Sequence, residues 1–476
     1  MTFRSRLVVV SAAAALSACA VNPATGKKEF MLVSEGQELA MGKEYDQQLV
    51  AEMGLYGDTA LANYVQRLGV RLAALSERPQ LPWAFRLVDD PVVNAFAVPG
   101  GYIYITRGIM AHMGSEAQLV SVLGHEIGHV TARHTAQQIT QQQLVGLGLG
   151  IGSLFSPTAA GIASVGAQIL FLKFSRDDES QADELGFRYM RSAQYDPREA
   201  ADMFAQLARV SGSSGSRLPE WQSTHPDPEN RREKALARAA TLPAAELSAA
   251  AVRRDEYFNR LDGMVFGPDP RQGYFVGARF VHPEMAFELT FPAAWQYVNQ
   301  RTLVAAQSAE KDAVVTLTFA DGASPAEAAR GFFATEGISG TPASGTINGL
   351  SAAGGAFTAQ TQQGAVQGEI QFVAHGGLVF QLMGYTPAER WATRRDAIRA
   401  ALRSLQRLTD QRILAVQPWR MDIVRTDRTL TPAEFLQRYP GPVAAEEIAL
   451  INQVDAGGRF MSRNLVKRVV GTALPR

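Results

Sequence analysis

The chain of 476 residues contains a single cysteine, Cys19. This scarcity excludes an intramolecular disulfide and a zinc site built from several thiolates. The chain also has no excess of either charge, because 46 lysines and arginines balance 46 aspartates and glutamates. We find no local basic cluster and therefore expect no nucleic-acid partner. Any metal site in this protein must be built from histidines and carboxylates.

The composition is that of a folded protein. Hydrophobic residues make up 46% of the chain, which is too high a fraction for a disordered polymer. One ordinary hydrophobic core does not extend over 476 residues, so the length predicts two or three domains.

The N-terminus has the pattern of a secretory signal. Arg4 and Arg6 precede an apolar run over residues 7–16, which is too short to span a bilayer. The run ends in Leu-Ser-Ala before Cys19, and this resembles the lipobox of bacterial lipoproteins. The resemblance implies that residues 1–18 are removed and that Cys19 is lipidated.

The lipoprotein resemblance also implies a location. Ala20, and not an aspartate, follows the cysteine, which in lipoprotein sorting implies the outer membrane, on its periplasmic side. We expect residues 19–34 to form a lipidated tether, since more than one acyl chain on Cys19 anchors a protein stably.

The motif with the clearest chemistry is His125-Glu126-Ile127-Gly128-His129, an H-E-x-x-H pattern. It lies in a stretch from about Ser115 to Gln143 that has helical apolar spacing. Residues four apart project about 40° from each other, so His125 and His129 can direct nitrogens at one metal ion. Glu126 can reach a water bound to that metal. The pattern predicts one zinc ion per chain.

A catalytic zinc needs a third protein ligand, and the sequence immediately after the motif does not offer one. The positions where a metzincin carries its glycine and third histidine hold Ala132 and Thr135. His134 lies about 140° from His129 around a continuous helix, so we expect it to be a surface histidine.

The better third ligand is Glu179. It follows Ser175 and Asp178, which together form a helix-capping pattern. On the resulting helix Asp183 shares a face with Glu179, so Glu179 can bind metal while Asp183 accepts a hydrogen bond from a ligating imidazole.

Four motifs in this order resemble one known family. They are Asn94–Gly101, His125–His129, Ser175–Asp183 and Ser223–Pro226. Together they resemble the gluzincin family of the CAAX prenyl endopeptidases, most closely its bacterial periplasmic branch, over about residues 21–240. The chain lacks the several transmembrane helices of the prenyl endopeptidases, so we do not expect prenylated substrates.

The resemblance implies roles for individual residues. In this family zinc is bound by two histidines and a glutamate, which map to His125, His129 and Glu179, and the general base maps to Glu126. The strand that holds substrate maps to Asn94, Ala95 and Phe96. The histidine near zinc maps to His225, which either stabilises the oxyanion or binds zinc as a fourth ligand and keeps the enzyme silent. Both alternatives stay open.

The rest of the chain predicts further domains. We expect the peptidase domain to span residues 35–245 and a linker to span residues 246–270. Residues 271–410 have the pattern of an α+β sandwich similar to PsbP-like domains. Residues 411–476 are similar to LysM, a peptidoglycan-contact module, although Asp427-Arg428 replaces its usual Gly-Asp.

The predicted fold class is therefore α+β. A mainly helical zincin-type metalloprotease domain with a small sheet precedes the sandwich and the LysM-like module. The glycine-rich run from Leu144 to Phe174 predicts a helical hairpin, either a lid over the site or part of the core.

These expectations combine into one function. The chain would be a lipid-anchored periplasmic zinc endopeptidase that cleaves misfolded or stalled envelope proteins, with its C-terminal half contacting substrate or peptidoglycan. The alternative is a non-catalytic chaperone or scaffold lipoprotein for outer-membrane protein assembly. Glu126 favours the enzyme, because a scaffold does not require it. A purely structural zinc site is a third interpretation, but such sites usually have four protein ligands.

Overall fold

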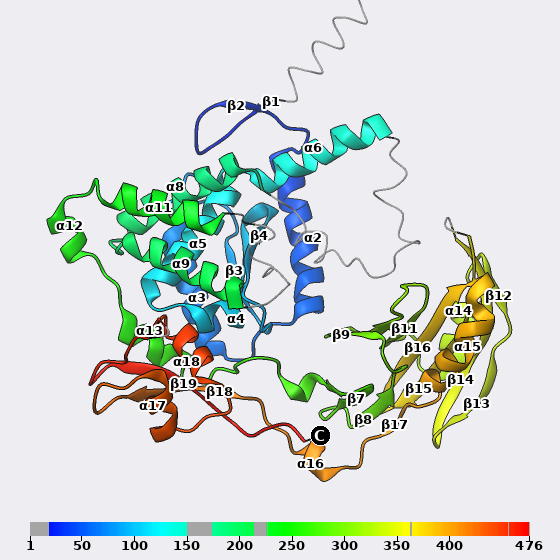
Figure 1. Ribbon diagram of the computed structural model, residues 1–476. Helices are drawn as coiled ribbons and strands as arrows, with labels where there is room; N and C mark the ends of the chain where they lie inside the picture. Colours follow the sequence, from blue (N-terminus) through cyan, green and yellow to red (C-terminus); the bar gives the residue numbers. More distant parts are fainter. Residues whose placement is uncertain are drawn as a thin grey trace, which may run out of the picture. The chain divides into compact units, whose positions relative to one another are not determined.

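The computed structural model describes residues 19–149, 174–213, 225, 227–361, 364–455 and 457–475. These residues form two compact units (Figure 1). Unit 1 contains the described residues up to 267 together with 419–471, and unit 2 contains the described residues of 268–418 and 472–475. The expected signal peptide and most of the expected hairpin from Leu144 to Phe174 lie outside the described residues.

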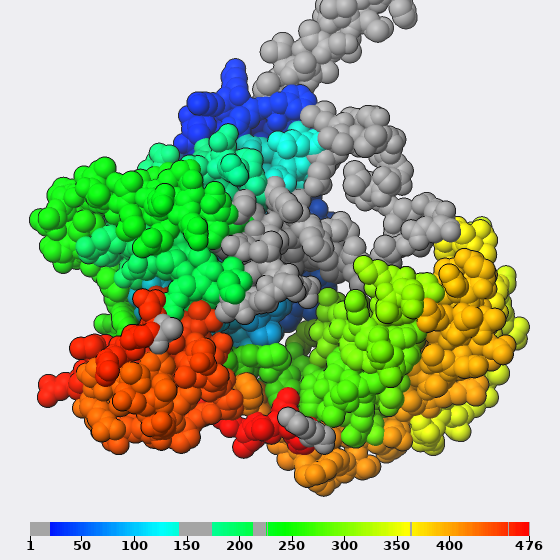
Figure 2. Space-filling model, in the orientation of Figure 1, coloured from blue at the N-terminus to red at the C-terminus, as the bar shows by residue number. Residues whose placement is uncertain are grey.

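The expected tether begins as a β-hairpin. Strand β1 (Cys19–Val21) pairs antiparallel with β2 (Lys28–Phe30), with Cys19 opposite Phe30 and Val21 opposite Lys28. On one face Ala20 packs with Met31 and with Ala136 of helix α6, while Val21 and Phe30 on the other face are about half exposed. The hairpin is therefore held on unit 1, at its surface (Figure 2).

A small sheet and the helices before it form the first part of unit 1. Their bounds are α2 (Glu35–Met53), α3 (Thr59–Ala73), β3 (Ala84–Val88), β4 (Ala95–Val98), β5 (Tyr102–Thr106) and α4 (Arg107–His112). In the sheet order β3-β5-β4, β3 runs parallel to β5 and β4 antiparallel to it. Ser34 and Asp58 cap the N-termini of α2 and α3.

The next part of unit 1 is helical and includes α5, the buried helix that carries the H-E-x-x-H motif. Their bounds are α5 (Glu116–Thr131), α6 (His134–Leu149), α8 (Arg176–Ser192), α9 (Arg198–Ser213), α11 (Pro228–Ala239), α12 (Ala244–Ala249) and α13 (Arg254–Leu261). Every residue of α5 is buried. The single helix expected over residues 115–143 is wrong in one respect, because Arg133 has φ +61° and breaks it into α5 and α6.

Helices α5 and α8 cross in close contact because small residues line both faces. A Cβ atom added at Gly128 would lie 3.0 Å from both Cα and the carbonyl oxygen of Ala182. A Cβ atom added at Gly186 would lie 3.0 Å from the backbone nitrogen of His125. Glycine at these positions lets the two backbones approach. The contact fixes the helix that carries His125 against the helix that carries Glu179.

A buried ion-pair cluster holds the C-terminal end of α5. Arg78 donates hydrogen bonds to Glu38, 2.8 Å away, and to the carbonyl oxygen of Val130 at 3.1 Å. Arg133 donates to the same Glu38 carboxylate at 2.8 Å and to the carbonyl oxygen of Val33. Because a buried charge requires a partner, this cluster ties the start of α2 to the turn between α5 and α6.

The C-terminal segment completes unit 1. Its elements are β18 (Arg420–Arg425), α17 (Pro432–Arg438), α18 (Ala445–Ile451) and β19 (Leu465–Val470), and β18 pairs antiparallel with β19. Lys467 is buried, and its Nζ donates to the carbonyl oxygens of Ala111 and Met113, each 2.8 Å away. Gln453 donates to the carbonyl oxygen of His112 and to the side chain of Gln118 in the first turn of α5.

The segment expected to be a linker, residues 246–270, differs from that expectation. It contains α13, whose Tyr257, Phe258 and Leu261 are buried in the core of unit 1. The Tyr257 hydroxyl donates to the carbonyl oxygen of Met110 at 2.7 Å. Because these three side chains are part of the hydrophobic core, the segment up to Gly267 belongs to unit 1. Unit 2 begins after Gly267.

Unit 2 is built from antiparallel sheets and two main helices. Its elements are β6 (Tyr274–Val276), β7 (Arg279–His282), β8 (Phe287–Thr290), β9 (Gln296–Gln300), β10 (Leu303–Gln307), β11 (Val314–Phe319), α14 (Pro325–Phe333), β12 (Ile338–Gly340), β13 (Ala343–Ile347), β14 (Leu350–Thr361), β15 (Gly364–His375), β16 (Leu378–Pro387), α15 (Trp391–Leu402), β17 (Gln406–Arg407) and α16 (Gln411–Leu414). The larger sheet has the order β12-β14-β15-β16-β11-β10-β9, with β13 also paired to β14, and the smaller has the order β17-β8-β7-β6. Helices and sheets in both units confirm the predicted α+β class.

Candidate metal centre

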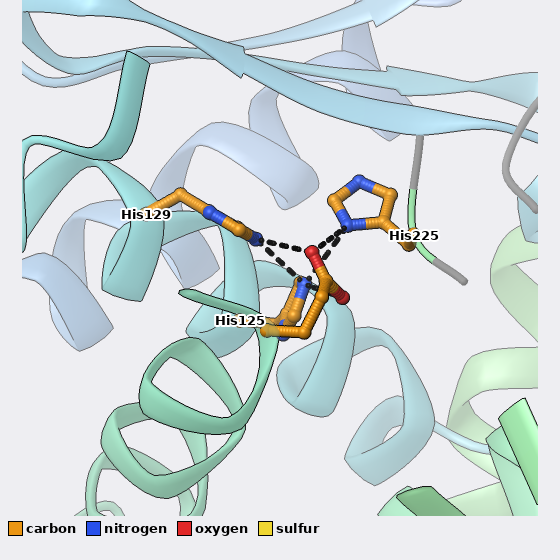
Figure 3. A group of neighbouring side chains, drawn as sticks. His125, His129 and His225 are labelled. Atoms are coloured by element: carbon orange, nitrogen blue, oxygen red, sulfur yellow. Dashed lines mark hydrogen bonds and ion pairs between the residues drawn. The ribbon is translucent and has the colours of Figure 1, made fainter. Parts of the chain in front are cut away.

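Four buried side chains converge from separate parts of unit 1. His125 and His129 come from α5, Glu179 from α8, and His225 from the residues before α11 (Figure 3). One potential ligand atom from each lies within 4.8 Å of all the others. Among the described residues this is the only such group of histidine, cysteine and carboxylate side chains.

The spacing of the donor atoms suits one small cation. Nε2 of His125 lies 3.0 Å from Nε2 of His129 and 3.2 Å from Nδ1 of His225. Oε1 of Glu179 lies 3.3 Å from Nε2 of His129 and 2.9 Å from Nδ1 of His225. Ligands bound tetrahedrally at about 2.0–2.1 Å lie about 3.3 Å apart, so these separations match the edges of a zinc coordination tetrahedron.

The protonation states also suit metal binding. Burial, with the nearby Arg231, lowers the pKa of His125 to about 3, which leaves a neutral imidazole. Burial alone would raise the pKa of Glu179, but His225, Arg231 and His125 outweigh it and hold that pKa well below its usual range. Neutral imidazoles and an ionised carboxylate are the forms that bind zinc.

Asp183 and Arg231 support the cluster from behind. Nδ1 of His125 lies 2.9 Å from Oδ1 of Asp183, the contact expected between a ligating imidazole and a carboxylate. The buried Arg231 of α11 lies 2.8 Å from Oε2 of Glu179 and 2.7 Å from Oδ1 of Asp183. The sequence does not predict Arg231 at the site, because the residue spacing within α11 does not show that its first turns pack against α8.

Glu126 lies beside the cluster without joining it. Its side chain is buried, and neither carboxylate oxygen has a hydrogen-bond partner among the described residues. Its Oε1 lies 3.6 Å from Nε2 of His225. Burial raises the pKa of Glu126 to about 7. A buried carboxylate without a partner is costly and is typical of a group that exchanges protons.

His134 contradicts its sequence interpretation as a surface histidine. It is fully buried, with Nδ1 2.9 Å from Nδ1 of His129 and Nε2 2.8 Å from Oε1 of Gln181. The interpretation fails because the 140° offset applies only to a continuous helix, and the left-handed Arg133 redirects the chain. A second neighbour, Phe174, has its ring 4.1 Å from that of His129 and was also missed.

The segment expected to hold substrate lies on β4, an end strand of its sheet. Ala95 and Phe96 are buried, and Phe96 stacks on Tyr104 with ring centroids 4.8 Å apart. Asn94, just before the strand, is buried, and neither side-chain polar atom has a hydrogen-bond partner in the described part of the chain.

Comparison with known proteins agrees with the geometry. Residues 59–239 match the family described as Peptidase family M48. This range contains His125, His129, Glu179 and His225, and the match confirms the resemblance to a metallopeptidase family that the four motifs predict.

Curated relatives match parts of the chain. The β-barrel assembly-enhancing protease of Escherichia coli strain K12 is 33% identical over 229 residues, and that of Yersinia pestis is 34% identical over 228 residues. Each match covers 46% of this chain and 47% of the relative. The mitochondrial metalloendopeptidase OMA1 of Arabidopsis thaliana is 36% identical over 174 residues, which is 36% of this chain and 35% of the relative. The chain thus spans about half or less of the length of these relatives.

A solved structure of cyanobacterial PsbP from Synechocystis sp. PCC 6803 aligns with 28% of this chain and 94% of its own, at 10% identity and a TM-score of 0.23. That likeness is too weak to assign a fold, so the PsbP-like and LysM-like parts stay predictions. Within the described residues, no helix has the length and apolarity to cross a membrane.

Proposed function

We propose that this protein is a zinc-dependent endopeptidase. One observation carries the proposal. Three buried histidines and a glutamate present donor atoms at tetrahedral spacing, and the buried Glu126 beside them is hydrogen-bonded to none of the four. In the proposed assignment His125, His129 and Glu179 hold the ion, and Asp183 orients His125.

The residues around the cluster account for peptide hydrolysis. Zinc, when bound, supplies a Lewis acid that activates water and polarises the scissile carbonyl. Glu126 takes the proton of the attacking water, for which a pKa near 7 is suited. It then passes that proton to the leaving amine. Burial of Glu126 keeps bulk water from competing for the proton.

His225 decides whether the site is open. A catalytic zinc needs one position free for water, whereas four protein ligands are typical of a closed site. Because Nδ1 of His225 lies within 3.2 Å of donor atoms of both His125 and Glu179, we propose that it acts as a fourth ligand and must move before substrate is cleaved. This favours the silencing role over oxyanion stabilisation.

Substrate would bind as an added strand. Strand β4 ends its sheet, and extended peptides bind such edges through main-chain hydrogen bonds. In this role Ala95 and Phe96 would supply the main-chain groups. The side-chain amide of Asn94, for which the described residues provide no hydrogen-bond partner, would bond the substrate backbone at the start of the strand.

Zinc content measured together with casein hydrolysis tests the proposal. The parent chain and Glu126→Gln are each expected to hold one equivalent of zinc, and only the parent is expected to hydrolyse casein. Glu184→Gln, at an exposed position of α8, is the matched control and should behave as the parent. Hydrolysis by Glu126→Gln at the parent rate would remove Glu126 from the mechanism.

A zinc-loaded but inactive parent would leave two interpretations, a self-inhibited enzyme or a scaffold. His225→Ala separates them, because it opens one coordination position. Hydrolysis that appears in His225→Ala and is lost again in the double variant with Glu126→Gln supports the self-inhibited enzyme. Continued inactivity in His225→Ala supports the non-catalytic chaperone or scaffold.

The proposed location is the periplasmic face of the outer membrane, with Cys19 as the lipid-bearing residue. The hairpin supports this proposal, since β1 starts at Cys19 and exposes apolar Val21 and Phe30 next to basic Lys28. Such a face suits a lipid surface. Cys19→Ser is expected to lose labelling by palmitate, and persistent labelling would contradict the anchor.

The proposed substrates are misfolded or stalled envelope proteins; the bacterial relatives are named as proteases that enhance β-barrel assembly. The C-terminal residues 419–471 would contact peptidoglycan if they act as a LysM module. Cosedimentation of the full chain with purified sacculi tests this contact, and recovery of all the protein in the supernatant would reject it.

A further inference from the structure

His134 connects a candidate metal ligand to a neighbouring helix. It begins α6, and its Nδ1 lies 2.9 Å from Nδ1 of His129. Its Nε2 lies 2.8 Å from the amide oxygen of Gln181 on α8, and 3.7 Å from Asp178, which is beyond hydrogen-bond reach. The ring is completely buried, so no bulk water replaces these contacts.

The role of His129 as a metal ligand determines which ring nitrogens of His129 and His134 carry protons. Nε2 of His129 faces the other donor atoms, 3.0 Å from His125 and 3.3 Å from Glu179. A neutral imidazole that binds a metal through Nε2 carries its proton on Nδ1. Nδ1–H of His129 therefore donates, and Nδ1 of His134 accepts. His134 must then carry its own proton on Nε2, which donates to Gln181.

We propose that His134 is the positioning residue of His129. With Gln181 behind it, His134 holds the His129 ring in the tautomer and orientation that turn Nε2 toward the metal, as outer partners of ligating histidines do. This inference rests on the proposed zinc function.

The two ligating imidazoles of α5 are thus supported by different chemistry. His125 has a charged acceptor, Asp183, at 2.9 Å, whereas His129 has a neutral ring. Glu126, Glu179 and Asp183 already concentrate three carboxylates in a buried site. A neutral acceptor orients His129 without adding a fourth negative charge to that site.

A pair of variants with the same shape separates the hydrogen bond from packing. In His134→Asn the amide oxygen takes the place of Nδ1 and still accepts from His129. In His134→Leu a methyl group stands there and cannot accept. The measurement is the zinc affinity of the full chain, by competition with a chelator. His134→Leu is expected to lose about 10- to 100-fold, and His134→Asn to stay within about threefold of the parent.

A second readout reports on the ligand itself. With Co²⁺ as the probe, the visible absorption spectrum of His134→Asn should match that of the parent, and the spectrum of His134→Leu should change. Equal zinc affinity in His134→Leu and the parent would overturn the proposal, as would equally weak binding in His134→Asn and His134→Leu.

Gln181→Met keeps the test decisive if His134→Leu does not fold. It removes only the outer hydrogen bond, which His134→Asn also loses, so a loss of zinc affinity of about threefold is expected, as in His134→Asn. If Gln181→Met binds zinc as tightly as the parent, the hydrogen bond from His134 to Gln181 has no part in holding His129, and the proposal is rejected. A parent chain that binds no zinc would instead reject the proposed function, and this inference with it.

Discussion

Gly128→Ala tests whether the close crossing of α5 and α8 sets the geometry of the metal centre. In an open helical position this change stabilises a helix by about 1 kcal/mol. At Gly128 the new methyl group would lie 3.0 Å from the backbone of Ala182, so α8 must move away by a few tenths of an ångström. Overpacking of this kind costs about 1–3 kcal/mol. We therefore expect Gly128→Ala to be up to about 2 kcal/mol less stable than the parent.

The same displacement should weaken metal binding. Glu179 lies one turn before Ala182 on α8, and metal–ligand distances tolerate only about 0.2 Å of error. The strain of about 1–3 kcal/mol is shared between folding and binding, so the zinc affinity should fall by no more than about 5- to 150-fold. A joint loss of stability and affinity cannot come from helix propensity, which would only stabilise α5.

Urea unfolding of the metal-free chain, followed by far-ultraviolet circular dichroism, measures the first effect, and chelator competition measures the second. Gly36→Ala in α2 is the matched control, because a Cβ there has no atom within 4 Å. The control should be at least as stable as the parent and bind zinc equally well. If Gly128→Ala matches Gly36→Ala in both measurements, the crossing does not set the site.

Three further predictions concern unit 1. Burial holds the pKa of Lys467 well below its usual value, so the unfolded state binds more protons than the folded state and the free energy of unfolding rises with pH. Between pH 7 and 9 the free energy of unfolding of the parent should therefore rise more than that of Lys467→Met. An equal rise in the two proteins would refute this prediction. Ser175→Ala removes the cap of α8 and should cost about 1 kcal/mol in urea unfolding, whereas an unchanged midpoint would show that the cap contributes nothing. Glu38→Gln leaves Arg78 and Arg133 without their shared carboxylate and should cost about 3–5 kcal/mol, while a thermal midpoint within a degree of the parent would contradict that role.

The sequence predicts those parts of the centre that local geometry encodes. His125 and His129 are four residues apart on one helix, and the cap at Ser175 sets the helix on which Glu179 and Asp183 share a face. Spacing along a helix is a property of the local chain, so the amino-acid order alone is enough to group these residues.

The parts that the sequence did not predict depend on long-range contacts. His134 reaches the site only because Arg133 adopts φ +61°, which depends on its buried bonds to Glu38 and Val33. Arg231 reaches α8 only because α11 packs beside it. The linker expectation failed for a related reason, since the partners of Tyr257 are distant in sequence and no local pattern identifies them.

The order of the segments in unit 1 has a consequence for biosynthesis. Residues 419–471, with the buried Lys467 and the half-buried Gln453, belong to unit 1, yet residues 268–418 of unit 2 are inserted before them. In synthesis from the N-terminus, His125, His129 and Glu179 are made long before Gln453, which bonds Gln118 in the first turn of α5, and long before Lys467, which bonds the carbonyl oxygens of Ala111 and Met113. Unit 1 would therefore complete its fold only after residues 419–471 have been synthesised, so that products truncated before them would not carry a completed unit 1.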